Sequence, residues 1–319
     1  MDFEILISNL TNPTLLFFVL GVIAASIKSD LEIPPSTSKF IALYLLFSIG
    51  FKGGQELALS GFTSEITYAL LFSILISAVI PFYSFFILKQ NLGVSNAGAV
   101  AATYGSVSAV TFVAAVTFLE AQQIEFGGHM VAVMALMESP AIIVGVILMR
   151  RYDKEEKGQG LGGIIKHSFT NGSVLMILGS LVIGLIADAK QAEGIKPFTT
   201  DIFKGFLAIF LLEMGMVTAK RFGAFRQYGW FAFLFAVIMP ALNGSLVAYA
   251  SQLVTEDIGN RFMFAILAAS ASYIAVPAAM RLAAPKADPG LYVPMALGIT
   301  FPFNITIGLP LYMLVVTST

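Results

Sequence analysis

A short phrase of small and hydroxyl-bearing residues occurs twice in this 319-residue chain. The copy at 105–111 returns 166 residues later at 271–277, and each copy interrupts an otherwise apolar stretch. In a membrane protein, polar breaks at corresponding positions of two halves indicate the binding site of a transporter. The expected substrate-binding residues are Gly105, Ser106, Val107, Ser108, Ala109, Val110, Thr111, Ser272, Tyr273, Ala275, Val276 and Pro277.

Pro277 suggests how the second break is built. Proline disrupts a helix interior but suits the first helical position, so residues 275–276 are expected to be unwound and a half-helix to begin at Pro277. Thr111 takes this place in the first copy, where Ser106 and Ser108 could act as caps. Each half-helix start would offer N–H groups to an anion, and each preceding half-helix end would offer carbonyl oxygens to a cation. The alternative is two kinks that serve packing alone.

Two carboxylates lie inside apolar segments, where ionisable groups are costly and usually functional. Glu138 precedes Pro140, and the matching region of the second half runs from 300 to 306. A carboxylate that faces Asn304 and Thr306 would bind sodium or a proton; alternatively, it is neutral or bonded to a nearby hydroxyl. Glu213 is expected either to function directly or to pair with Lys52 or Lys204. The candidate sodium ligands are Thr103, Glu138, Ser270, Asn304 and Thr306.

The composition is that of an integral membrane protein. Hydrophobic residues make up 57% and charged residues 12%, against roughly 25% charged residues in a soluble domain. A net charge of −1 argues against nucleic-acid binding, and the absence of cysteine excludes disulfides and thiolate metal sites. A G-x-G-x-x-G pattern at 158–163 follows no expected strand, so it predicts no nucleotide site. No enzyme activity and no cofactor are expected beyond a coupling sodium ion.

Ten apolar segments are long enough to span a bilayer. An odd number of spans in each half would place the halves in opposite orientations, giving an all-α inverted repeat with broken, crossing fourth and ninth helices. The predicted units are a first repeat at 1–150, a linker at 151–165 and a second repeat at 166–319. The spans are predicted at 12–28, 38–54, 64–88, 96–119, 129–150, 170–188, 201–219, 227–252, 260–284 and 290–316.

The basic residues predict the orientation. Five of the 18 fall on one side, namely Lys52, Lys190, Lys196, Lys204 and Arg261, and the other 13 fall on the opposite side. The richer side should be cytoplasmic. Both termini are therefore expected outside a bacterial inner membrane, with the linker inside.

Several segments together resemble the sodium-dependent bicarbonate transporter family known from cyanobacteria, almost from end to end. They are Asn12-Pro13-Thr14-Leu15, Ile33-Pro34, residues 49–54, Tyr104–Thr111, Glu138-Ser139-Pro140-Ala141 and Ala268–Arg281. The resemblance implies a ten-helix inverted repeat with a mobile core and a gate or scaffold domain. It also implies sodium symport by an elevator-like movement, a homotrimer, and a PII-like regulatory protein that binds the cytoplasmic face.

The chain departs from this family at both breaks. Where the family resembles Ser-Ser-Ser-Asp, this chain has Ser270-Ala271-Ser272-Tyr273; where it resembles Ser-Gly-Ser-Thr, this chain has Ser108-Ala109-Val110-Thr111. The prediction is sodium-coupled symport of a small anion, with bicarbonate as first candidate. One alternative is a proton- or sodium-coupled carrier of a small organic acid on the same fold. The second is an anion channel or a non-transporting membrane receptor.

Overall fold

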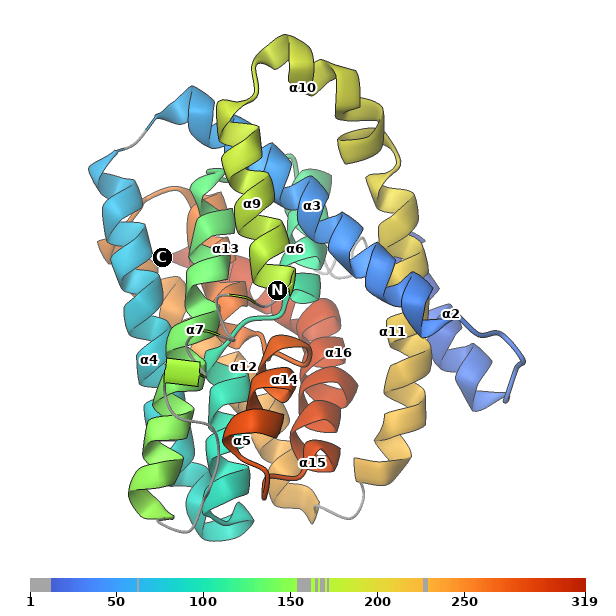
Figure 1. Cartoon of the computed structure of the whole chain (residues 1–319), viewed down its shortest axis with the longest axis vertical. Coiled ribbons are helices and arrows are strands. Elements are labelled where there is room, and N and C mark those ends of the chain that lie inside the picture. The colour runs from blue at the N-terminus through green and yellow to red at the C-terminus, as the bar shows by residue number, and fades with distance from the viewer. Residues whose placement is uncertain are drawn as a thin grey trace.

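The computed structural model describes residues 13–61, 63–153, 162–163, 166, 170, 172–225 and 229–319, and every regular element in these ranges is helical (Figure 1). Within them, six helical segments are long and apolar enough to cross a membrane: 64–92, 94–121, 129–152, 189–220, 229–253 and 289–318. Three shorter apolar helices lie at 16–26, 172–186 and 258–269. The chain is a multi-pass membrane protein. Most of the predicted linker, at 154–161 and 164–165, lies outside the described residues.

A helix or helix series occupies each of the ten predicted segments. The first half contains α2 (Pro13–Ser26), α3 (Pro35–Ser60), α4 (Ser64–Leu92), α5 (Val94–Gly105), α6 (Ala109–Ala121) and α7 (His129–Tyr152). The second contains α9 (Gly172–Ile186), α11 (Phe203–Phe225), α12 (Gly229–Ala250), the short η3 (Ser251–Leu253), α13 (Ile258–Ala269) and α14 (Ala275–Ala283). The last segment is the series α15 (Pro289–Pro294), η4 (Met295–Thr300), α16 (Phe301–Phe303), η5 (Asn304–Gly308) and α17 (Leu309–Ser318).

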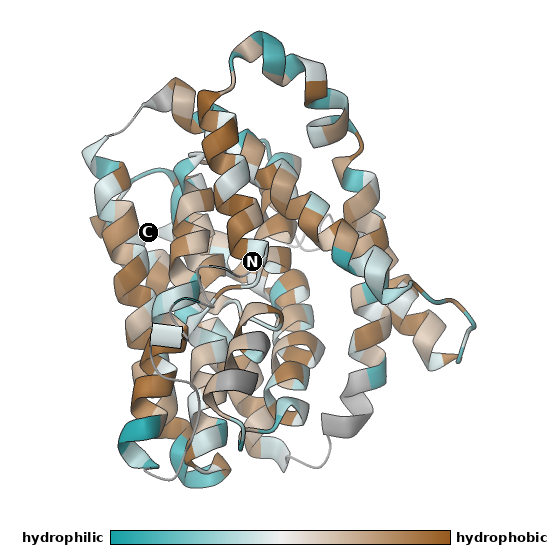
Figure 2. Ribbon diagram, viewed as in Figure 1, coloured by the Kyte–Doolittle hydropathy of each residue, from teal (hydrophilic) through white to brown (hydrophobic). Residues whose placement is uncertain are grey.

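The sequence did not predict the helical connection between α9 and α11. It consists of α10 (Ala189–Lys196) and the π-helical η1 (Pro197–Asp201), and the side chain of Asp188 caps its start by accepting from the Gln191 N–H at 2.8 Å. Figure 2 shows hydrophilic residues gathered on α10 and at the opposite ends of the long helices, while apolar residues cover the middle of these helices. This distribution fits a protein with an apolar belt.

Glycines bring two pairs of helices into backbone contact. A Cβ added at Gly54 of α3 would collide with the backbone of α9 at Leu181, and one added at Gly215 of α11 would collide with the backbone of α2 at Phe18. The close packing expected of small residues in membrane helices therefore joins α3 to α9 and α2 to α11. We call α2, α3, α9 and α11 the outer group, and α4 to α7 with α12 to α14 the inner group. Figure 1 shows α3 running obliquely across the more upright inner helices.

Both predicted breaks are present in the inner group. α5 ends at Gly105 and α6 begins at Ala109; α13 ends at Ala269 and α14 begins at Ala275. The prediction that residues 275–276 are unwound was wrong, because Pro277 is the third residue of α14 and not the first. The first-turn amides of a helix have no partner within the helix, so proline at the third position removes no helical hydrogen bond.

Candidate functional site

The two breaks are hydrogen-bonded to each other. The Ser108 N–H donates to Ser270 Oγ at 3.0 Å, and the Ser272 N–H donates to the Thr103 carbonyl at 2.9 Å. Each bond runs from one half of the sequence to the other. Since extended backbone at membrane depth must be satisfied within the protein, these two bonds hold the breaks together as one crossing.

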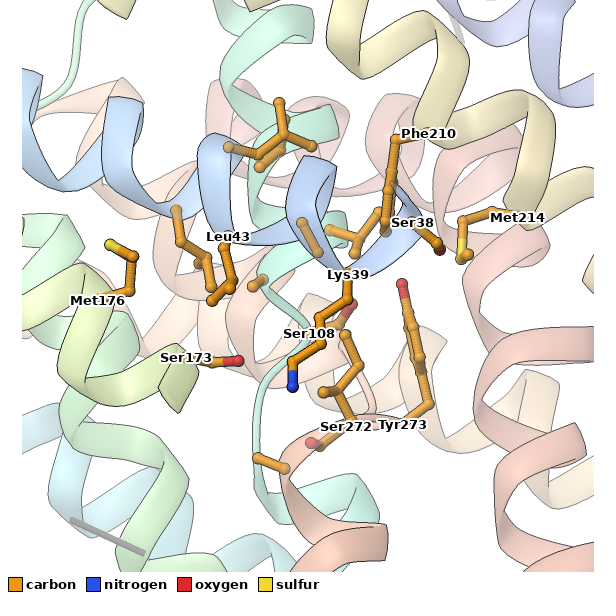
Figure 3. A pocket seen from close by; sticks show the side chains of 18 of the residues that line it. Ser38, Lys39, Leu43, Ser108, Ser173, Met176, Phe210, Met214, Ser272 and Tyr273 are labelled. Carbon is orange, nitrogen blue, oxygen red and sulfur yellow. The ribbon is translucent and has the colours of Figure 1, made fainter. Parts of the chain in front are cut away.

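A cavity of about 730 Å³ lies between this crossing and the outer group (Figure 3). The outer wall comes from α3, α9 and α11, and includes Ser38, Lys39, Ser173, Phe210 and Glu213. The wall is mainly apolar, with a few polar groups that converge on the breaks, which is the usual character of a small-molecule site. The predicted site residues that line it are Val107, Ser108, Ala109, Val110, Glu138, Ser272, Tyr273 and Ala275.

The helix starts place unpaired amides on this cavity. The Thr111 N–H is capped by Ser108 Oγ at 3.2 Å, but the amides of Ala109 and Val110 donate no hydrogen bond to any residue the structure describes. On α14 the same holds for Ala275, whereas the Val276 N–H donates to Ser272 Oγ at 3.4 Å. A cavity lined by such amides at two helix N-termini can accept an anion.

The other predicted substrate residues are buried behind the cavity lining. Gly105 lies against the ring of Pro81, where a Cβ would collide with α4. The Ser106 hydroxyl is fully buried and has no hydrogen-bond partner among the described residues. Thr111, Val276 and Pro277 are also buried. These residues shape the crossing from behind.

Glu138, on α7, forms part of the cavity wall. Its side chain is only 8% exposed, and its Oε2 atom has no hydrogen-bond partner within the described parts of the chain. A buried carboxylate needs a proton or a cation, because an unpaired charge in such an environment is strongly unfavourable. Glu138 is therefore able to bind a proton or a cation in the wall of this cavity.

The remaining sodium candidates fall into two places. Thr103 and Ser270 belong to the crossing, and Asn304 joins it by donating from Nδ2 to the Ala269 carbonyl at 2.8 Å. Thr306 instead donates to the Pro302 carbonyl in its own helix at 2.7 Å. Neither Asn304 nor Thr306 lines the cavity that Glu138 lines. No cluster of three or more His, Asp or Glu suited to a resident metal occurs in the described ranges.

The predicted ion pair of Glu213 with Lys52 or Lys204 was wrong. Glu213 Oε2 accepts from the Ser38 hydroxyl, while Lys52 and Lys204 pair with Glu120 at 3.6 and 3.1 Å. The reason is the length of the helices. At 1.5 Å per residue, Lys52 lies about 20 Å beyond Ser38 along α3, out of reach of Glu213.

Glu120 thus connects the helix groups at the other end of their interface. It lies on α6, in the inner group, whereas its two lysine partners lie on α3 and α11 of the outer group. A second cavity of about 750 Å³ is lined by Lys52 and Glu120 of this triad, and Glu56 and Glu125 are also in its wall. The first cavity is lined by residues 35–46 of α3 and the second by residues 49–59, so the two open at opposite halves of that helix.

Sequence reasoning missed the outer wall of the first cavity. Ser38, Met176, Phe210 and Met214 are ordinary members of apolar segments, and only a three-dimensional arrangement brings them to the breaks. Lys39 carried a usable signal, since it is a charged residue within the predicted span 38–54.

Comparison with known proteins shows the family of this chain. No curated protein matches the chain. The model of the Na+-dependent bicarbonate transporter superfamily matches residues 13–317, nearly the whole chain and both breaks. The protein whose crossed helix breaks line this cavity therefore belongs to the Na+-dependent bicarbonate transporter superfamily.

Proposed function

We propose that this protein is a secondary active transporter that couples inward movement of sodium to uptake of a small anion, with bicarbonate as first candidate. The observation that carries the proposal is the meeting of three unpaired amides and a buried carboxylate on one cavity. The amides of Ala109, Val110 and Ala275 provide the anion site, and Glu138 provides the cation site.

The anion site uses backbone rather than a dedicated positive side chain of the inner group. α6 and α14 both begin at the cavity, so the positive ends of two helix dipoles lie beside it. The hydroxyls of Ser108 and Ser272 stand at the same starts. Such a site suits a compact anion with several acceptor oxygens, which bicarbonate is.

The cation site is proposed at Glu138, with oxygen atoms of the crossing at Thr103, Ser270 and Asn304 close to the same breaks. Sodium prefers oxygen ligands, and half-helix ends at a transporter crossing supply them. Binding of a cation at Glu138 would neutralise a carboxylate that otherwise repels the incoming anion. This electrostatic dependence is the physical basis proposed for coupling.

We propose an inverted repeat of ten helices with an elevator-type movement of the inner group against the outer group. Gly50 of α3 and Gly215 of α11 occupy corresponding positions in the two halves, and each packs on a helix of the other half. The groups are separated by a cavity at one end and joined through Glu120 at the other. A cavity lies at each end of this interface, and the Glu120 ion pairs bridge the groups beside the second one, which leaves room for the proposed movement.

The proposed topology places both termini outside and the 151–165 linker in the cytoplasm. A C-terminal fusion to a reporter active only in the cytoplasm should stay dark, and fusions within the linker should be active. An active C-terminal fusion would show that the orientation is the opposite of the proposed one. The homotrimer and the PII-like partner stay predictions, which mass measurement in detergent and a pull-down on the cytoplasmic face would check.

The function itself is tested by uptake into proteoliposomes. Labelled bicarbonate, formate, acetate and lactate are each offered with an inward sodium gradient, with a proton gradient, or with neither. Sodium-driven accumulation of bicarbonate is expected. Proton-driven or lactate-selective accumulation would favour the organic-acid carrier. Flux that never exceeds equilibrium would indicate a channel, and no flux of any anion would favour a receptor.

A further inference from the structure

We infer that Lys39 of α3 is the substrate's countercharge, contributed to the anion site by the outer helix group. This inference rests on the proposed function, because it assigns a further binding residue to the same cavity. Lys39 was not among the residues expected at the site, and among the residues that the structure describes it is the only lysine or arginine that lines this cavity.

The geometry carries the assignment. In Figure 3 the Lys39 side chain extends from α3 toward the breaks, and its ammonium group lies among the hydroxyls of Ser108, Ser173 and Ser272 in that view. These serines line the same cavity and come from α9 and from both breaks. Lys39 therefore lines the same cavity as Ala109, Val110 and Ala275, whose amides are unpaired among the described residues.

The acidic residues near Lys39 do not neutralise its ammonium group. Within the described parts of the chain, no carboxylate lies within ion-pair distance of its Nζ. Glu138 and Glu213 share the cavity; Glu213 is bonded to Ser38, and Glu138 is the proposed cation site. Lys39 lies four residues after the start of α3 and is exposed, so its ammonium group is free to meet an anion that enters the cavity opposite the two helix N-termini.

Lys39 and the breaks belong to different helix groups. An anion held between them would contact both groups at once, whereas the backbone amides alone would hold it only to the inner group. Hydrogen bonds to charged groups change affinity by about ten- to a hundredfold. Removal of the ammonium group should therefore raise the KM for the anion by that factor. The KM for sodium should change less.

The chain contains no cysteine, so a single introduced thiol can be modified selectively. Lys39→Cys is reconstituted and its anion KM is measured before and after reaction with three methanethiosulfonates. Each forms a disulfide with the thiol as methanesulfinate leaves, and so adds an aminoethylthio, a methylthio or a sulfonatoethylthio group. The aminoethyl group restores a positive charge at nearly the length of lysine and should bring KM back toward the wild-type value. The methyl and sulfonatoethyl groups should not. Lys196→Cys is the control, because Lys196 is exposed on α10 and pairs with Glu193 at 3.4 Å.

The outcomes separate this inference from the proposed function. If the wild type shows sodium-driven uptake and Lys39→Cys keeps the wild-type KM, Lys39 is not the countercharge and the proposed function stands. The same conclusion follows if neutral and positive groups rescue equally. If the wild type shows no uptake, the melting temperature is measured in bicarbonate, formate, acetate and nitrate. An anion-dependent rise in melting temperature that is present in the wild type and lost in Lys39→Cys would support the inference. If no anion raises the melting temperature of the wild type, both proposals are wrong.

Discussion

The starts of α6 and α14 occupy equivalent positions in the two sequence copies but are built with different chemistry. Ser108 precedes α6 and caps it through its side chain, whereas Ile274, 166 residues later, precedes α14 and offers no side-chain cap. The third helical residue explains how both are stable. Thr111 has an N–H that the Ser108 hydroxyl satisfies, and Pro277 has no N–H to satisfy.

This difference makes the proposed anion site asymmetric. The α6 start leaves two first-turn amides unpaired, at Ala109 and Val110, but the α14 start leaves only that of Ala275, because Ser272 binds the Val276 amide. We therefore expect the anion to depend more on α6 than on α14. At the second start the Ser272 hydroxyl satisfies the second amide of α14, and Pro277 leaves no third amide to satisfy.

A second contrast concerns Glu138 and Thr300, which lie two positions before Pro140 and Pro302. Glu138 lines the cavity and has an oxygen without a partner among the described residues, whereas Thr300 does not line the cavity and its hydroxyl is hydrogen-bonded. The Thr300 hydroxyl donates to the Ala236 carbonyl at 2.7 Å and also contacts the Tyr104 hydroxyl at 2.7 Å. One half thus carries the proposed ion site and the other a structural hydrogen bond.

The largest effect is expected from filling the crossing. Ala109→Leu and Ala275→Leu each place a bulky side chain where an anion must approach the backbone, so both should abolish uptake while the protein stays monodisperse. Ala58→Leu, on an exposed face of α3, is the control for the substitution itself. Normal transport by both cavity variants would show that the crossing is not the binding site.

Replacing the proposed ion ligand should have the next largest effect. Glu138→Gln keeps the shape of the side chain but removes its charge, so the sodium concentration for half-maximal uptake should rise on the order of a hundredfold. Thr300→Val should leave sodium dependence unchanged and lower thermal stability, since it removes a buried hydrogen bond. The contrast fails if the two variants show the same sodium dependence.

The sequence predicted the parts of this architecture that depend on local patterns. Apolar segments of sufficient length gave the helices, and the polar interruptions at 105–111 and 271–277 gave the breaks. It could not predict that Lys39, Phe210 and Glu213 line the same cavity as the breaks, because that arrangement depends on how α3 and α11 pack across the inner group. The first residue of α14 was also predicted wrongly, because proline is tolerated throughout the first turn of a helix and does not mark its first residue.

Deleting one amide tests the asymmetry directly. Proline at the first helical position is well tolerated when the preceding residue is extended, and Ser108 is extended, with φ −107° and ψ 111°. The Ala109→Pro variant should therefore fold, and its affinity for the anion should fall by about tenfold. That is the effect of one hydrogen bond to a charged group. Flow dialysis or anion-dependent melting measures the affinity. An unchanged affinity would remove the Ala109 amide from the site.

The smallest effect is expected from the residues that precede the two helices. Ser108→Ala removes the cap of Thr111, which costs about 1 kcal/mol of helix stability. The Thr111 amide that loses its cap is buried behind the cavity lining, so it gives the anion no new partner. The anion affinity should therefore fall about threefold and no more than tenfold. Ile274→Ala removes no cap and should change affinity less than about twofold. Equal losses in both variants would mean that the two starts hold the anion in the same way, against the asymmetry that the unpaired amides indicate.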